Sequence, residues 1–142
     1  MTTTWSDEDR TTRLRALADL LPVLTAPDAD FGRWVVPPPK DGIQSLGWYE
    51  FGPAGEAFQR AVGGWILPGF DWRAWVETVD GIALREPAGV ATASSDQLAM
   101  LLTAIVRSDR FVEGSIAGAF ESGLLEAICR RAVALLGGGA SS

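Results

Sequence analysis

One apolar pattern, over residues 98–106, constrains the fold most strongly. Residues recur at i, i+3, i+4, i+7 and i+8, the spacing typical of one buried face of a helix. Continuing that spacing would place Asp109 and Glu113 on the same face, where an unpaired charge is costly. The sequence therefore predicts either that the helix breaks near Ser108 or that arginines pair with these acids. The apolar positions are Leu98, Leu101, Leu102, Ile105 and Val106.

Capping residues, prolines and glycines predict further helices. Ser6 precedes three acidic residues, and both a serine N-cap and negative charge stabilise a helix N-terminus. An apolar stripe follows, and Pro22 and Pro27 are expected to close this first helix. A second helix is expected to begin at Gly52-Pro53, because proline suits the first helical position, and to end at Gly63-Gly64.

The C-terminal part of the chain carries similar signals. Ser94-x-x-Gln97 has the form of a capping box that starts the helix holding the 98–106 face. A linker is expected at 89–93, and two short helices at 115–122 and 124–136. Gly123 fits the position just after a helix end.

The segment Phe70-Asp71-Trp72-x-x-Trp75 is an informative helix entry. With Asp71 as N-cap, Phe70 and Trp75 stand at the two positions of a hydrophobic staple, and the helix is expected to run to about Leu84. Core packing is the favoured interpretation because aromatic side chains dominate cores. The alternative is that Trp72 and Trp75 form an aromatic platform for a ligand.

Between residues 31 and 51 the pattern is that of a β-hairpin. Aromatic and β-branched residues at 33–36 and 46–51 flank Pro37–Pro39 and Asp41-Gly42, which favours two short strands joined by a loop. The fold class that we predict is mainly α: a single compact domain of five to six helices with a small two-stranded β element. It is expected to span residues 1–136, with a flexible Gly/Ser tail at 137–142.

Composition excludes several classes of function. The chain has 142 residues, a formal net charge of −6, one cysteine and no histidine. The absence of histidine excludes Ser–His–Asp and Cys–His nucleophile systems and histidine-based metal sites, and we expect neither a metal nor a cofactor. The negative charge disfavours nucleic acid as a partner because phosphate binding needs clustered cations.

We also expect no membrane association. The apolar run at 98–106 is far too short to cross a bilayer. The first residues lack the apolar region of a signal peptide, so a cytoplasmic location is expected.

The charged segment near residue 110 resembles a known family. The residues that carry the likeness are Leu101-Leu102-Thr103-Ala104-Ile105-Val106-Arg107-x-Asp109-Arg110-Phe111-x-Glu113-Gly114, Glu121-Ser122-Gly123, Arg130-Arg131, Phe70-Asp71-Trp72-x-x-Trp75 and Phe31-Gly32-x-Trp34. Together they resemble the bacterial family catalogued as domain of unknown function 6508, from about Leu14 to Leu136. The resemblance implies a single, mostly helical domain and carries no activity, substrate or cofactor with it.

We call five residues the charged cluster: Arg107, Asp109, Arg110, Glu113 and Glu121. Three interpretations of it stand side by side. In the first, ion pairs lock the turn between two helices. In the second, the cluster lines a cleft for a partner protein or a small anionic ligand, because arginine forks suit carboxylate or phosphate, with Trp72 or Trp75 as an apolar wall. In the third, Glu113 and Glu121 act as general acid and base of an enzyme. We expect a binding or interaction module, with the histidine-free enzyme as the alternative.

Overall fold

The computed structural model of the chain describes residues 4–111 and 113–137. This part contains eight α-helices, one 3₁₀ helix (η1) and one two-stranded antiparallel sheet. The predicted fold class, a mainly α domain with a small two-stranded β element, is confirmed, with more helices than expected. In chain order the elements are α1 (Asp7–Thr25), β1 (Gly32–Val35), β2 (Trp48–Phe51), α2 (Pro53–Val62), η1 (Gly63–Trp65), α3 (Trp72–Trp75), α4 (Val79–Ala83), α5 (Pro87–Val90), α6 (Ser95–Ser108), α7 (Ser115–Glu121) and α8 (Leu124–Gly137).

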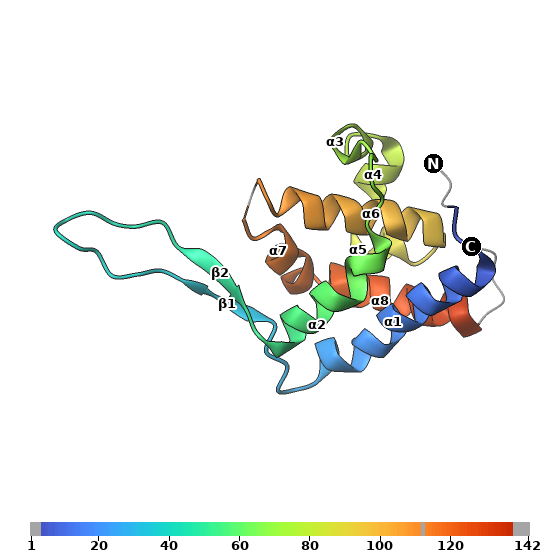
Figure 1. Cartoon of the computed structure of the whole chain (residues 1–142), viewed down its shortest axis with the longest axis horizontal. Helices are drawn as coiled ribbons and strands as arrows, with labels where there is room; N and C mark the ends of the chain where they lie inside the picture. Colours follow the sequence, from blue (N-terminus) through green and yellow to red (C-terminus); the bar gives the residue numbers. More distant parts are fainter. Residues whose placement is uncertain (1–3, 112, 138–142) are drawn as a thin grey trace.

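Helix α6 lies at the centre of the core. Nine of its 14 residues are buried, and it packs against α3, η1, α7 and α8. Helices α1 and α8 lie side by side and share the most extensive helix–helix contact, while α2 packs on α1 and α5 on α8 (Figure 1). The 98–106 pattern thus predicted the central helix. Within the described residues, no helix is long and apolar enough to cross a membrane.

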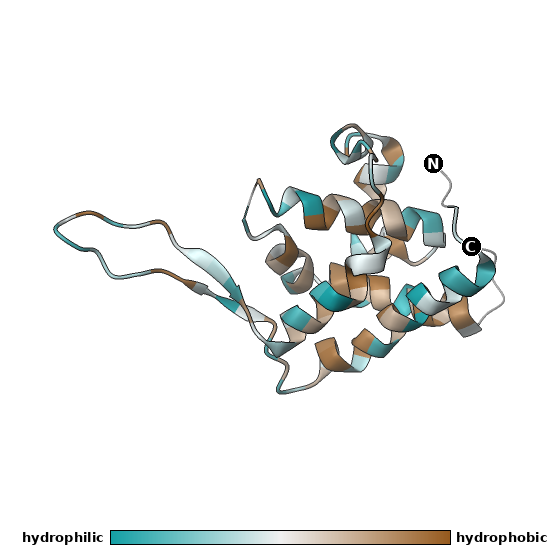
Figure 2. Cartoon of the chain, in the orientation of Figure 1, coloured by the Kyte–Doolittle hydropathy of each residue, from teal (hydrophilic) through white to brown (hydrophobic). Residues whose placement is uncertain are grey.

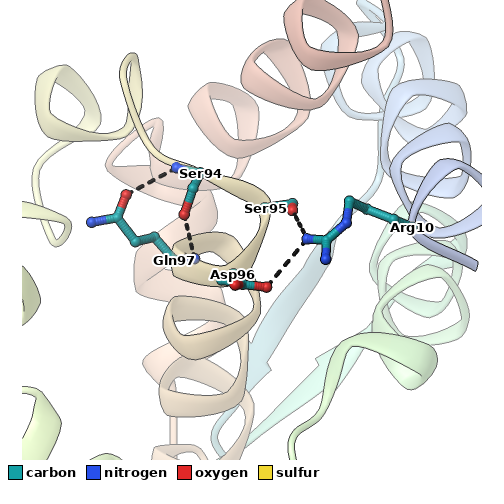
Figure 3. Close-up of polar contacts among 5 residues, drawn as sticks. All are labelled: Arg10, Ser94, Ser95, Asp96 and Gln97. Carbon is teal, nitrogen blue, oxygen red and sulfur yellow. Dashed lines mark hydrogen bonds and ion pairs between the residues drawn. The ribbon is translucent and has the colours of Figure 1, made fainter. Parts of the chain in front are cut away.

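A part-buried polar contact joins α1 to the start of α6. The Arg10 guanidinium donates from Nη1 to the Ser95 hydroxyl and lies 3.2 Å from the Asp96 carboxylate (Figure 3). The predicted capping box is confirmed beside it: Gln97 N–H donates to Ser94 Oγ, and Ser94 N–H donates to the Gln97 side chain. The capping box therefore provides partners for backbone N–H groups at the start of α6. Arg10 joins this end of α6 to α1, although Arg10 and Ser95 are 85 residues apart in sequence.

Three helix boundaries differ from the predictions. Helix α1 continues through Pro22 to Thr25, because Leu24 is buried and keeps the last turn on the core. The helix expected over 72–84 is two helices, because Thr78 caps a new one: its hydroxyl accepts the Gly81 N–H and donates to the Trp75 carbonyl. The expected linker at 89–93 overlaps a short helix, α5, whose Val90 is fully buried.

Strands β1 and β2 form the base of a hairpin that extends away from the helical body as a long arm (Figure 1). We call residues 32–51 the hairpin arm. Its tip is the Asp41-Gly42 turn, where both residues have positive φ (54° and 74°) and Lys40 and Ile43 exchange backbone hydrogen bonds. Two positive φ values define a type I′ turn, which matches the twist of paired strands. The predicted two-stranded element is therefore confirmed.

The last helix begins as predicted and ends one residue later than predicted, so Gly137 belongs to the helix and not to the expected tail. Gly123 has φ +85°, the left-handed conformation expected after a helix end, and α8 continues to Gly137. The rest of the predicted tail, 138–142, lies outside the described residues.

Replacing Arg10 by methionine should destabilise the fold, because Ser95 is fully buried and would lose its charged partner. We expect the free energy of unfolding to fall by about 1–3 kcal/mol, as for loss of a hydrogen bond to a charged group. Urea denaturation measures this value. Arg15→Met, at an exposed position of the same helix, is the matched control and should change stability by less than about 0.5 kcal/mol. Equal effects of the two substitutions would contradict a specific role for Arg10.

Candidate functional site

Helix α6 ends at Ser108, and Asp109 caps the helix that follows. Asp109 is the C-cap residue of α6, and its Oδ1 accepts the backbone N–H groups of Gly114 (3.2 Å) and Ile116 (3.1 Å). The first N–H groups of a helix have no partner within it, and the N-cap residue of α7 is a glycine without a side chain to supply one. Asp109 thus takes over the capping function from five residues upstream. We call residues 109–111, 113 and 114 the corner.

Glu113 connects the corner to the hairpin arm. Its carboxylate Oε2 accepts the backbone N–H of Tyr49 in β2. The Trp34 ring of β1 lies against Gly114, where an added Cβ would come within 2.7 Å of the ring and where φ is +104°. Only glycine suits both that conformation and that close approach. The corner therefore contacts both strands at the base of the arm, β2 through Glu113 and β1 through Gly114.

Of the two alternatives for Asp109 and Glu113, the helix break near Ser108 is confirmed, and pairing with arginines is wrong for the described residues. The helix breaks at Ser108, and none of the three ion pairs in this part of the chain involves the cluster. Backbone N–H groups, not guanidinium groups, satisfy Asp109 and Glu113. The physical reason is that α7 and β2 present unpaired N–H donors at this point.

The cluster lies at the surface: Glu113 is exposed and Asp109 is half-buried. Glu121, the last residue of α7, is exposed, as is Arg110, whereas Arg107 is half-buried in the last turn of α6. Burial raises the pKa of the Tyr49 phenol, and the negative charges of Glu121 and Asp30 raise it further.

The structure thus brings two of the predicted acids to the same tyrosine. Glu113 contacts the main chain of Tyr49, and the Glu121 charge acts on its phenol. Their use as general acid and base stays a prediction. Tyr49 was not predicted as a site residue, because it is 64 residues from Glu113 along the chain and no local sequence pattern links the two.

The two tryptophans proposed as an aromatic wall have different environments. Trp75 is buried and its ring lies 6.1 Å from that of Phe70, and Asp71 accepts the Ala74 N–H at 3.2 Å. The predicted staple and cap are therefore confirmed. Trp72 is half-buried, 6.2 Å from the Phe111 ring of the corner.

Arg73 adds a cationic face to that aromatic pair. Its guanidinium carbon lies 4.3 Å from the centre of the Phe111 ring and 5.4 Å from that of Trp72. A guanidinium within about 6 Å of an aromatic face is attracted by the ring quadrupole. The contact joins α3 to the corner, so Phe111 has a partner although its side chain is exposed.

The single thiol lies away from these residues. Cys129 is buried in α8, and burial together with the nearby Glu126 charge raises the pKa of its thiol to about 12. A thiol with so high a pKa forms almost no thiolate near neutral pH, and the thiolate is the reactive species. Among the described residues, no three cysteine, aspartate or glutamate side chains are grouped so that they could hold a metal ion.

Comparison with known proteins gives one result. A family model described as "Family of unknown function (DUF6508)" matches residues 10–137. The chain belongs to this family. The DUF6508 match covers all of α1 but its first three residues and every later element to α8, and it includes the corner, the base of the arm and the staple. Searches of curated proteins and of solved structures return no match.

Two glycines that lie four residues apart test the corner. Gly114→Ala should lower the free energy of unfolding by about 1–3 kcal/mol, the usual cost of a strained backbone conformation, because its Cβ would also meet Trp34. Gly118→Ala, within α7 and with open space around its Cβ position, should raise stability by about 0.5–1 kcal/mol. Urea denaturation of both variants checks the opposite signs. A neutral Gly114→Ala would show that the corner does not depend on this contact.

Proposed function

We propose that this chain is a binding module whose hairpin arm docks onto a partner protein. The observation that carries the proposal is the clustering of exposed apolar side chains on one projecting element. Five of the ten exposed large apolar side chains among the described residues lie on the arm, and Figure 2 shows brown, hydrophobic stretches along it. Contiguous exposed apolar surface marks interaction sites in soluble proteins. The five are Trp34, Val36, Ile43, Leu46 and Trp48.

The outer part of the arm does not serve the chain's own core. Leu46 is 93% exposed and Ile43 is 70% exposed, whereas only Tyr49 and Phe51, near the base of the arm, pack against the buried cluster. Fully burying a side chain of this size is worth about 1.5–3 kcal/mol. A partner with an apolar groove would recover that free energy.

The arm favours recognition through side chains over addition of a strand. Pro37, Pro38 and Pro39 follow β1 after a single residue, Val36, and proline has no N–H to donate to a neighbouring strand. Natural edge strands use proline to block unwanted pairing. We therefore assign recognition to the apolar side chains and not to the backbone edges.

The base of the arm holds it in one orientation. Phe31, just before β1, is buried, and its ring stacks on that of Phe120 in α7 with the ring centres 4.3 Å apart. The corner adds two contacts, the Glu113–Tyr49 hydrogen bond and the packing of Trp34 against Gly114. An element fixed before binding loses less conformational entropy on association. This arrangement supports a docking role for the arm.

The test begins with a photo-crosslinking amino acid in place of Leu46, introduced into the full chain in its host cell. We expect one dominant adduct with a different protein, identified by mass spectrometry. Affinity for the purified partner is then measured by calorimetry. Ile43→Ser with Leu46→Ser should weaken binding at least about tenfold, as for loss of central apolar contacts.

The matched control uses two apolar residues that are exposed elsewhere. Val79 and Ile82 of α4 are 85% and 59% exposed, so Val79→Ser with Ile82→Ser removes similar surface and should leave affinity unchanged. Thermal unfolding confirms that both double variants are folded. An adduct of two copies of this chain, or equal loss of affinity in both variants, would overturn the proposal.

A further inference from the structure

A second surface, separate from the arm, has the composition of a small-molecule site. A pocket of about 250 Å³ opens between α3, α6 and the start of α8. Its apolar walls include Trp75, Leu101, Ile105 and Leu124, all of them buried core residues. Ligand sites are concave and mostly apolar, with a few polar groups that orient the ligand. The walls of this pocket meet the first condition.

The polar groups of the pocket meet the second condition. Arg85 and Ser108 are among its lining residues, and no lining residue carries a carboxylate. The Arg85 Nη2 donates to the Val76 carbonyl at the end of α3, which holds the guanidinium in place. A guanidinium has five N–H donors, and Arg85 takes part in none of the ion pairs among the described residues. The pocket is therefore apolar with one positive charge.

We propose that this pocket binds a small organic monocarboxylate, with the carboxylate on Arg85 and the apolar body against Trp75 and Leu101. Arginine suits a carboxylate because its fork can donate two parallel hydrogen bonds. At about 30 Å³ per non-hydrogen atom, the volume of a water molecule in the liquid, the cavity holds about eight such atoms. Hexanoate has this size and is the probe.

Two features keep this proposal independent of the arm. The lining residues belong to helices α3, α6 and α8 and to the Arg85 segment, and none lies in residues 32–51. Trp72, which lines the pocket, is held by Arg73 and Phe111. Loss of partner binding in arm variants therefore leaves this site intact, and the two proposals fail separately.

The experiment titrates the full chain with hexanoate and with 1-hexanol, which has the same apolar body without the charge. Calorimetry gives the affinities, and the ¹⁵N–¹H indole signals of Trp72 and Trp75 report on the pocket. We expect saturable binding of hexanoate in the millimolar range and at least about tenfold weaker binding of 1-hexanol, as for loss of a hydrogen bond to a charged group. Both indole signals should shift with hexanoate.

Three variants locate the site. Arg85→Gln should abolish the preference for hexanoate over 1-hexanol, whereas Arg60→Gln, an exposed arginine of α2, should preserve it. Ala104→Leu adds bulk at a residue that lines the pocket and should remove binding of both probes, with thermal unfolding as the check that it folds. Absence of saturable hexanoate binding, equal affinity for the two probes, or an unchanged preference in Arg85→Gln would each overturn the proposal.

Discussion

Backbone N–H groups without partners in their own helix or strand determine the geometry of the corner, and much of the rest depends on it. The carboxylates of Asp109 and Glu113 accept three such N–H groups, from Gly114, Ile116 and Tyr49. The two contacts of Asp109 are part-buried and that of Glu113 is exposed; a donor left unsatisfied away from water costs about 1–3 kcal/mol, so the Asp109 contacts contribute most. Two acids within five residues therefore fix the start of α7 and the base of the hairpin together.

Signals that act within a few residues made much of the fold predictable. The Ser94 capping box, the Phe70–Trp75 staple, the Asp71 cap and the Gly123 helix end all appear as the sequence indicates. Each depends on contacts between residues no more than five positions apart. The break between α3 and α4 was missed although Thr78 is a good N-cap residue. Gly81 allows it, because a Cβ there would lie 2.2 Å from the Trp75 carbonyl oxygen.

The partners of the charged cluster were not predictable in the same way. The apolar periodicity of residues 98–106 correctly indicated Asp109 and Glu113 as unusual, and it predicted a helix break near Ser108 as one of two alternatives. Periodicity could not indicate which donors would bind these carboxylates. The Tyr49 N–H belongs to a hairpin that is distant in sequence and whose base packs on α7. Arginines close in sequence were the obvious partners, but exposed ion pairs add little stability. Capping a helix and a strand satisfies the same acids more effectively.

The corner also relates the two candidate surfaces to each other. On one side Gly114 receives the Trp34 ring of the arm, and on the other Phe111 lies beside Trp72, a wall of the pocket. Arg73 stacks over Phe111 and Trp72 and so completes the second connection. One short segment therefore contacts both the apolar arm and a wall of the apolar cavity, which gives this segment a structural role without assigning it chemistry.

The tight turn at the end of the arm has a practical consequence. Lys40, the only lysine of the chain, lies next to that turn and is exposed. Its ε-amine is thus the single side-chain amine for acylating reagents, and it lies beside the turn that closes the arm, an arm that extends away from the helical body (Figure 1). A fluorophore or an immobilisation tag attached through lysine would therefore lie at the tip of the hairpin arm. Protein coupled to a surface in this way would expose its helices to solution and cover the apolar side chains of the arm.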